Sequence, residues 1–207
     1  MESNWATEHL QVIRTLMERS AVYRRALAPV MTANGVLGTL AAVAGVVARI
    51  EAPRQFIGYW MAVALVAAGG SLLLVRRQAL KEAEPFWSPP TRRVAQALLP
   101  PLGCGFALGL ILLTRDGGVA AWVRWLPLLW IALYGCALHA AGFFMPRGMK
   151  IFGWGLVLGS SGLGAFSLSV PIDPVLYGHG VMGLFFGLAH LAYGTYLYFT
   201  EPRRNET

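Results

Sequence analysis

The chain has 207 residues and a formal net charge of +7; apolar residues make up 56% of it and charged residues only 13%. Soluble domains carry about 25% charged residues, so a chain this small lacks the polar side chains to cover a water-exposed surface. The composition excludes a soluble globular enzyme, a disordered chain and a collagen-like fibre. It predicts an integral membrane protein whose first partner is the lipid bilayer. The excess of Lys and Arg then indicates cytoplasmic loops rather than nucleic-acid binding.

Residues 1–27 form the first predicted unit, a cytoplasmic amphipathic helix. Apolar residues recur there at helical spacing, which is typical of a helix lying on a membrane surface. Four arginines are expected at the membrane surface: Arg14, Arg19, Arg24 and Arg25. These charges precede any apolar run, so no cleavable signal peptide is expected. The helix is either a topology anchor or a docking surface for a protein partner or lipid.

Six apolar segments follow and form the second predicted unit, residues 28–199. Each is close to the roughly 20 residues that a helix needs to cross a bilayer. They are expected to be helices, because open strand edges cannot be satisfied in lipid. The predicted spans are 28–49, 56–75, 94–114, 120–144, 150–170 and 174–199, with a cytoplasmic tail at 200–207. The predicted fold is therefore an all-α, six-span membrane protein. Short matches between its spans suggest an arrangement in three tandem helical hairpins.

The distribution of basic residues predicts the orientation. If both termini are cytoplasmic, thirteen of the 17 Lys and Arg residues fall in inner segments and four fall in outer loops. The four outer ones are Arg49, Arg54, Arg115 and Arg124. The positive-inside rule therefore favours cytoplasmic N- and C-termini.

Glycine is the predicted packing device. Helices in lipid associate through close contact at small residues, because lipid tails are as apolar as leucine. The glycines expected at helix interfaces are Gly105, Gly109, Gly155, Gly159, Gly183 and Gly187. Pro100 and Pro101 are expected to kink the third span.

Two histidines, His139 and His190, are predicted within the membrane and toward the bundle interior. Together with Cys136 and Cys104 they are candidates for a soft metal site, or the two histidines for axial ligands of a haem b. The alternative is that each histidine forms a hydrogen bond across a helix interface. His179 is expected near the outer interface and solvated.

No Asp, Glu, Lys or Arg lies deep in the predicted spans, and this disfavours an ion- or proton-coupled carrier. The leading hypothesis is a non-enzymatic accessory, regulatory or small-ligand-binding membrane protein. The haem or metal subunit is the first alternative.

A second alternative is an intramembrane serine hydrolase. Gly159-Ser160-Ser161-Gly162 on one span and His190 on the next look like the Ser–His dyad of rhomboid proteases, which also have six spans. A serine needs such a base to become nucleophilic. The sequence departs from rhomboids in two ways. Ser161 and His190 lie on consecutive spans, and Phe143 stands where a His-x-x-x-Asn pattern beginning at His139 would need asparagine.

The stretch from Val12 to Tyr23 and the last span, from Gly183 to Gly194, resemble a group of uncharacterised bacterial six-span membrane proteins. The resemblance implies a multi-pass protein of the bacterial inner membrane. It implies no activity.

Overall fold

The computed structural model describes residues 26–81, 83, 85–115, 117–167 and 171–200. This part of the chain is helical, and no strand occurs among the described residues. Its elements are helix Ala26–Val47, α2 (Pro53–Lys81), α3 (Pro89–Thr114), α4 (Val119–Val123), α5 (Leu126–Ala141), α6 (Arg147–Ser167), α7 (Pro174–Met182), the π-helix η1 (Gly183–Ala189) and α8 (His190–Thr200). The all-α prediction is confirmed. The predicted N-terminal helix and C-terminal tail lie outside the described residues.

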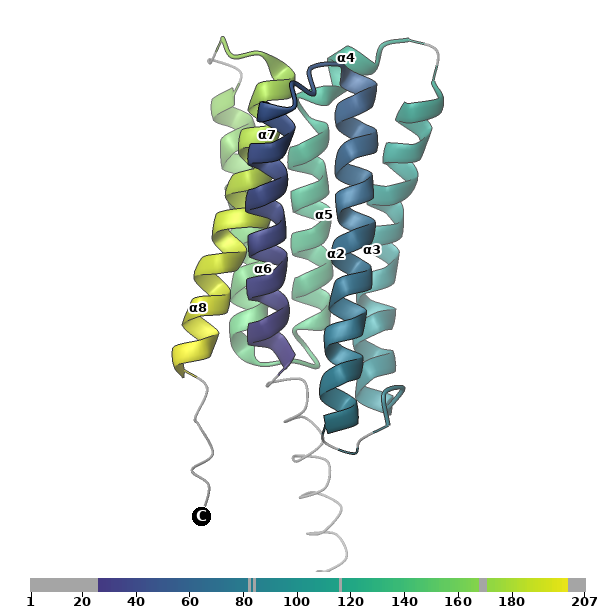
Figure 1. The fold of residues 1–207 in the computed structure, drawn as a ribbon, viewed down its shortest axis with the longest axis vertical. Helices are drawn as coiled ribbons and strands as arrows, with labels where there is room; N and C mark the ends of the chain where they lie inside the picture. Colours follow the sequence, from purple (N-terminus) through teal and green to yellow (C-terminus); the bar gives the residue numbers. More distant parts are fainter. Residues whose placement is uncertain (1–25, 82, 84, 116, 168–170, 201–207) are drawn as a thin grey trace, which may run out of the picture.

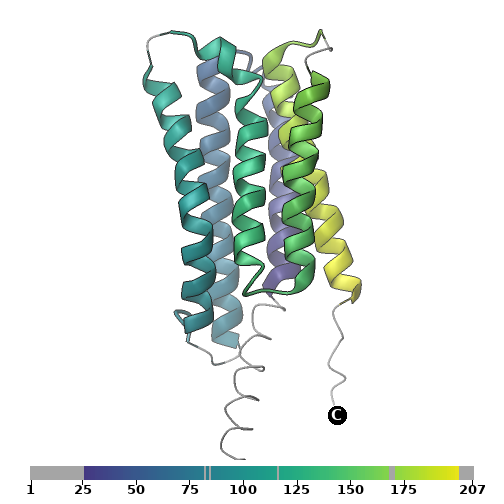
Figure 2. The ribbon, with the colours of Figure 1, turned by 180° about the vertical axis from the view of Figure 1, so that it is seen from behind.

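The long helices run side by side, alternately up and down (Figure 1). α7, η1 and α8 follow one another without a break and form a single rod, called here the last rod. α5 lies between α3 and α6, as the view from behind shows (Figure 2). The first described helix begins, and the last rod ends, at the same end of the bundle, called here the lower end.

Four helices are long and apolar enough to cross a membrane: Ala26–Val47, Pro53–Lys81, Thr91–Thr114 and Pro174–Thr200. The six predicted spans are thus only partly reproduced. The segment predicted at 120–144 divides into α4 and a 16-residue α5, with Pro127 in the first turn of α5. α6 has 21 residues and is rich in glycine and serine, and it is not one of these four helices. The arrangement in three tandem hairpins stays a prediction.

α3 continues through Pro100 and Pro101. A proline in a helix interior removes one backbone hydrogen bond, and long helices tolerate this where neighbours satisfy the freed groups. α3 therefore remains one continuous helix across the two prolines.

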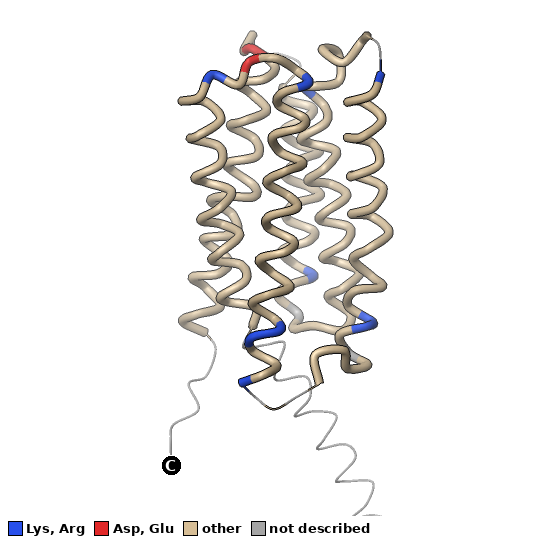
Figure 3. Tube along the Cα trace, turned by 45° about the vertical axis from the view of Figure 1, so that its right-hand side comes forward, with Lys and Arg blue, Asp and Glu red and all other residues tan. Residues whose placement is uncertain are grey.

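Charged residues gather near the two ends of the bundle (Figure 3). Between these layers the described helices carry no Asp, Glu, Lys or Arg. The described acidic residues, Glu51 and Asp173, both lie at the upper end, together with four arginines. The lower end carries Arg76, Arg77, Lys81, Arg92, Arg93, Arg147 and Lys150. The apolar middle and charged ends are typical of a membrane protein.

The first described helix packs on the last rod through small residues. A Cβ on Gly38 would meet the backbone of Phe186, and one on Gly187 would lie 2.6 Å from Thr39 Oγ1. A Cβ on Gly183 would lie 2.7 Å from that of Ala42. The two backbones therefore approach more closely than larger residues would allow.

The other predicted packing glycines do not all lie at helix contacts. Gly105 and Gly109 face Trp130 from α3, and Gly159 faces the ring of Phe185. Gly155 needs a correction, because a Cβ there would meet no atom within 4 Å and the residue is exposed. Gly155 lies on the outer face of α6, away from the face that contacts the neighbouring helices.

Candidate functional site

Two histidines of the last rod are among the buried polar residues of the described bundle, together with Ser160 and Ser167. His179 in α7 is 2% exposed and His190 at the start of α8 is 1% exposed. Buried polar groups in a protein are almost always hydrogen-bonded. The partners of the two imidazoles therefore decide what chemistry they can perform.

His179 bridges α7 to the first hairpin. The indole N–H of Trp60 donates to His179 Nδ1 at 3.2 Å, and His179 Nε2 lies 3.2 Å from the Ile50 carbonyl oxygen. Indole is a donor only, so Nδ1 accepts and the single proton of a neutral imidazole sits on Nε2, which donates to Ile50. Both ring nitrogens are thereby occupied.

The expectation that His179 is solvated is wrong. Gly45 leaves room for the imidazole, since a Cβ on that glycine would overlap the ring. The ring of Phe56 meets the imidazole edge-on, with centroids 4.9 Å apart. The position of His179 near the outer end of its predicted span suggests solvation, but the glycine that opens a cavity for its ring lies on another helix, outside any local pattern.

His190, near the middle of the last rod, also has both ring nitrogens in hydrogen bonds. Its Nδ1 lies 2.8 Å from the carbonyl oxygen of Phe185, to which it donates. Nε2 is then the acceptor, and the Tyr134 hydroxyl donates to it from α5 at 3.1 Å. The rings of Tyr134 and Phe186 stack on the imidazole, and Phe152 meets it edge-on. The histidine thus joins the last rod to α5 and α6.

The carbonyl that His190 binds belongs to the π-helical turn η1. A π-helix widens the turn and is rare outside single turns, often at functional positions. Here the backbone N–H of His190 donates to Gly187, and the side chain supplies the donor for Phe185. The imidazole therefore supports the irregular turn that carries the small residues of the interface with the first described helix.

His139 differs from both. It lies in the last turn of α5 and contacts the rings of Phe143 and Trp154, with centroids 5.5 and 5.4 Å away. Its Nδ1 is buried without a hydrogen-bond partner among the described residues. Cys104 and Cys136 are exposed free thiols. Within the described part of the chain, no three His, Cys, Asp or Glu side chains gather as metal ligands.

The two members of the serine–histidine alternative have other partners. The Ser161 hydroxyl donates to the carbonyl of Val157 at 2.8 Å, and Ser161 is exposed on the outer face of α6. Both nitrogens of His190 are taken by Phe185 and Tyr134. Neither ring nitrogen is available to activate Ser161.

A third polar contact, which is partly buried, joins the first described helix to α2. Asn34 Nδ2 donates to Ser71 Oγ at 3.0 Å, and the Ser71 hydroxyl lies 3.3 Å from Asn34 Oδ1. Interhelical hydrogen bonds of this kind hold transmembrane helices in register.

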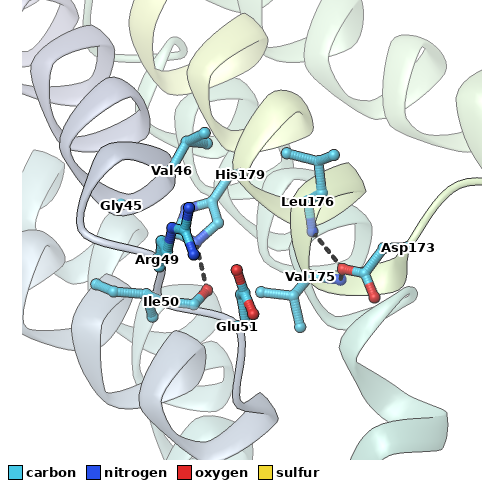
Figure 4. Close-up of a pocket in the computed structure, with 9 residues that line it drawn as sticks. All are labelled: Gly45, Val46, Arg49, Ile50, Glu51, Asp173, Val175, Leu176 and His179. Carbon is cyan, nitrogen blue, oxygen red and sulfur yellow. Dashed lines mark hydrogen bonds between the residues drawn. The ribbon is translucent and has the colours of Figure 1, made fainter.

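The upper end carries a pocket of about 280 Å³ between the end of the first described helix, the loop after it and the start of α7. Figure 4 shows Arg49, Glu51 and His179 on one side of it and Asp173 on the other. Its remaining lining residues are Gly45, Val46, Ile50, Val175 and Leu176. Arg49 was expected only as one of four outer basic residues, and the pocket that it lines was not predicted.

The predicted membrane-surface residues Arg14, Arg19, Arg24 and Arg25 lie outside the described residues. Comparison with known protein families, curated proteins and solved structures finds no match to this chain. The residues themselves are therefore the basis for any functional assignment.

Proposed function

We propose that the chain is a six-span protein of the bacterial inner membrane, with both termini cytoplasmic, and that it acts without catalysis as an accessory membrane protein. The seven basic residues described at the lower end, against four at the upper end, favour a cytoplasmic lower end. The described chain also begins and ends there.

α5 and α6 complete the proposed six spans. The 16 residues of α5 rise about 24 Å, which is short of a hydrocarbon core of about 30 Å. α4 precedes α5 directly and adds a further turn at the upper end. The 21 residues of α6 rise about 31 Å, enough for a span. Since α5 packs between α3 and α6, it shares the depth of its neighbours.

The observation that carries the non-catalytic role is the pairing of three interior polar groups; among the described residues, His139 Nδ1 and the Tyr193 hydroxyl are the buried side-chain atoms that lack a partner. His179, His190 and the Asn34–Ser71 pair all bond to other residues of the bundle. Proton relays and general bases need a nitrogen or oxygen that is open to substrate or water. These groups instead hydrogen-bond one helix to another. Such an interior suits a protein that acts by binding partners through its surface.

The N-terminal segment is the proposed contact for a protein partner, because its predicted helix adjoins the basic lower end. Deleting residues 5–25 from the tagged full chain is expected to remove a co-purifying partner, measured by quantitative mass spectrometry of affinity-purified membranes. Membrane insertion and the melting temperature of the remaining bundle should persist, since the described core begins at Ala26.

Deletion of residues 201–207 is the matched control, because it shortens the other end of the chain at the same membrane face. It should leave the partner bound. Retention of every partner after loss of residues 5–25 would show that the docking role is wrong.

A further inference from the structure

The upper pocket combines charges of both signs on one small surface. Glu51 and Asp173 are exposed carboxylates, and Arg49 is an exposed guanidinium. Asp173 caps α7, where its Oδ1 accepts from the backbone N–H groups of Val175 and Leu176, both at 2.9 Å. The pocket thus offers sites for a cation and for an anion side by side.

Arg49 occupies a backbone position that favours glycine. Its φ is 51°, in the left-handed region, and it follows the C-terminus of the first described helix. Ile50 N–H donates to Gly45 and Arg49 N–H to Val46, the two bonds of a Schellman cap. A residue other than glycine is costly at this position. The strained arginine therefore suggests that its side chain has a binding role.

The pocket also borders the lipid-facing side of the bundle. Val46 is 46% exposed and Leu176 is 51% exposed, so apolar surface continues from the pocket along two helices. The charged rim and apolar flank match the boundary between lipid headgroups and acyl chains. A volume of about 280 Å³ lies just below the usual range for drug-sized ligands, about 300–1,000 Å³, and suits a headgroup.

We propose that this pocket binds the phosphoethanolamine headgroup of a membrane lipid, with Arg49 on the phosphate and the carboxylates of Glu51 and Asp173 on the ammonium. A primary ammonium donates hydrogen bonds to carboxylates, and a guanidinium pairs with phosphate oxygens. This inference rests on the proposed function, because it requires the upper end to lie at a membrane interface, and it names the ligand of an accessory protein.

Other headgroups fit less well. Choline has no N–H to donate and is typically held by aromatic rings, whereas Phe, Tyr and Trp are missing from the nine lining residues. Phosphatidylglycerol has no ammonium for the two carboxylates and adds a negative charge beside them. The pocket therefore selects for the amine.

Native mass spectrometry of the full-length protein in detergent, titrated with lipids of matched acyl chains, tests the proposal. Phosphatidylethanolamine is expected to bind about fivefold more tightly than phosphatidylcholine or phosphatidylglycerol, as one partly exposed ion pair allows. E51Q should remove most of that preference, because the carboxylate discriminates between the headgroups. R49Q should instead weaken the binding of all three lipids, since each carries the phosphate that Arg49 pairs with. R115Q replaces an exposed arginine at the same end outside the pocket and should leave both the affinities and the preference unchanged.

R49G separates binding from folding. Glycine relieves the left-handed strain, so the melting temperature should not fall, while the affinity for all three lipids should drop with the loss of the phosphate contact. Equal binding of the three lipids by the parent protein, or undiminished lipid affinity in R49G, would overturn the proposal. Soluble glycerophosphoethanolamine binding as tightly as the lipid would overturn the membrane source. This measurement in detergent does not depend on topology, so its failure leaves the six-span proposal intact.

Discussion

Gly38→Ala is expected to destabilise the bundle by about 2 kcal/mol and to lower the melting temperature in detergent by roughly 4–8 °C. The added Cβ would run into the carbonyl group of Phe186 in η1. A backbone carbonyl cannot relieve the clash by changing rotamer as a side chain can, so the first described helix and the last rod would have to separate. Thermal unfolding of the purified protein, followed by circular dichroism, measures the change.

Gly69→Ala is the matched control for this substitution. Gly69 lies inside α2, and a Cβ there would meet no atom within 4 Å. Alanine favours a helix over glycine by about 1 kcal/mol, so the control should keep or slightly raise the melting temperature. If both variants melt alike, the glycine contacts do not hold these helices together.

His190→Phe is expected to cost at least about 2 kcal/mol, since it leaves two buried groups without partners. The phenyl ring keeps the stacking position beside Tyr134 and Phe186. It neither donates to the Phe185 carbonyl nor accepts from the Tyr134 hydroxyl. The expected drop in melting temperature is roughly 4–8 °C.

Two further variants rank the contributions of these hydrogen bonds to the stability of the bundle. Tyr134→Phe leaves one group unpaired, the Nε2 of His190, and should cost about 1 kcal/mol. His139→Phe makes the same exchange at a histidine whose Nδ1 has no described partner, so it should cost least. Equal losses in H190F and H139F would contradict the role given to the His190 hydrogen bonds.

The helical class and most helix boundaries could be predicted because they depend on local composition. The last predicted span, 174–199, matches the rod Pro174–Thr200 closely. An Asp-Pro start and an unbroken apolar run are visible in the sequence itself. The division of 120–144 was missed, because α4 and α5 separate at Arg124 and Trp125 inside a segment that remains apolar on both sides.

The polar contacts were less accessible to sequence reasoning. His190 was correctly expected in the bundle interior, since glycines flank it at helical spacing. Its partner Tyr134 and the π-helical turn depend on the register between helices, which no local pattern encodes. The burial of His179 was missed for the same reason: Gly45 and Trp60, which enclose it, lie more than a hundred residues away along the chain.

The central claim is that α5 and α6 each cross the membrane, and single-cysteine labelling tests it most directly. In a protein with Cys104 and Cys136 replaced by alanine, cysteine is placed at Arg115, Phe144 or Ile172, which are all exposed. Right-side-out vesicles are treated with a membrane-impermeant maleimide before and after lysis. The six-span account predicts that R115C and I172C react in sealed vesicles and that F144C reacts only after lysis. Labelling of F144C in sealed vesicles together with the other two would show that α5 and α6 do not cross.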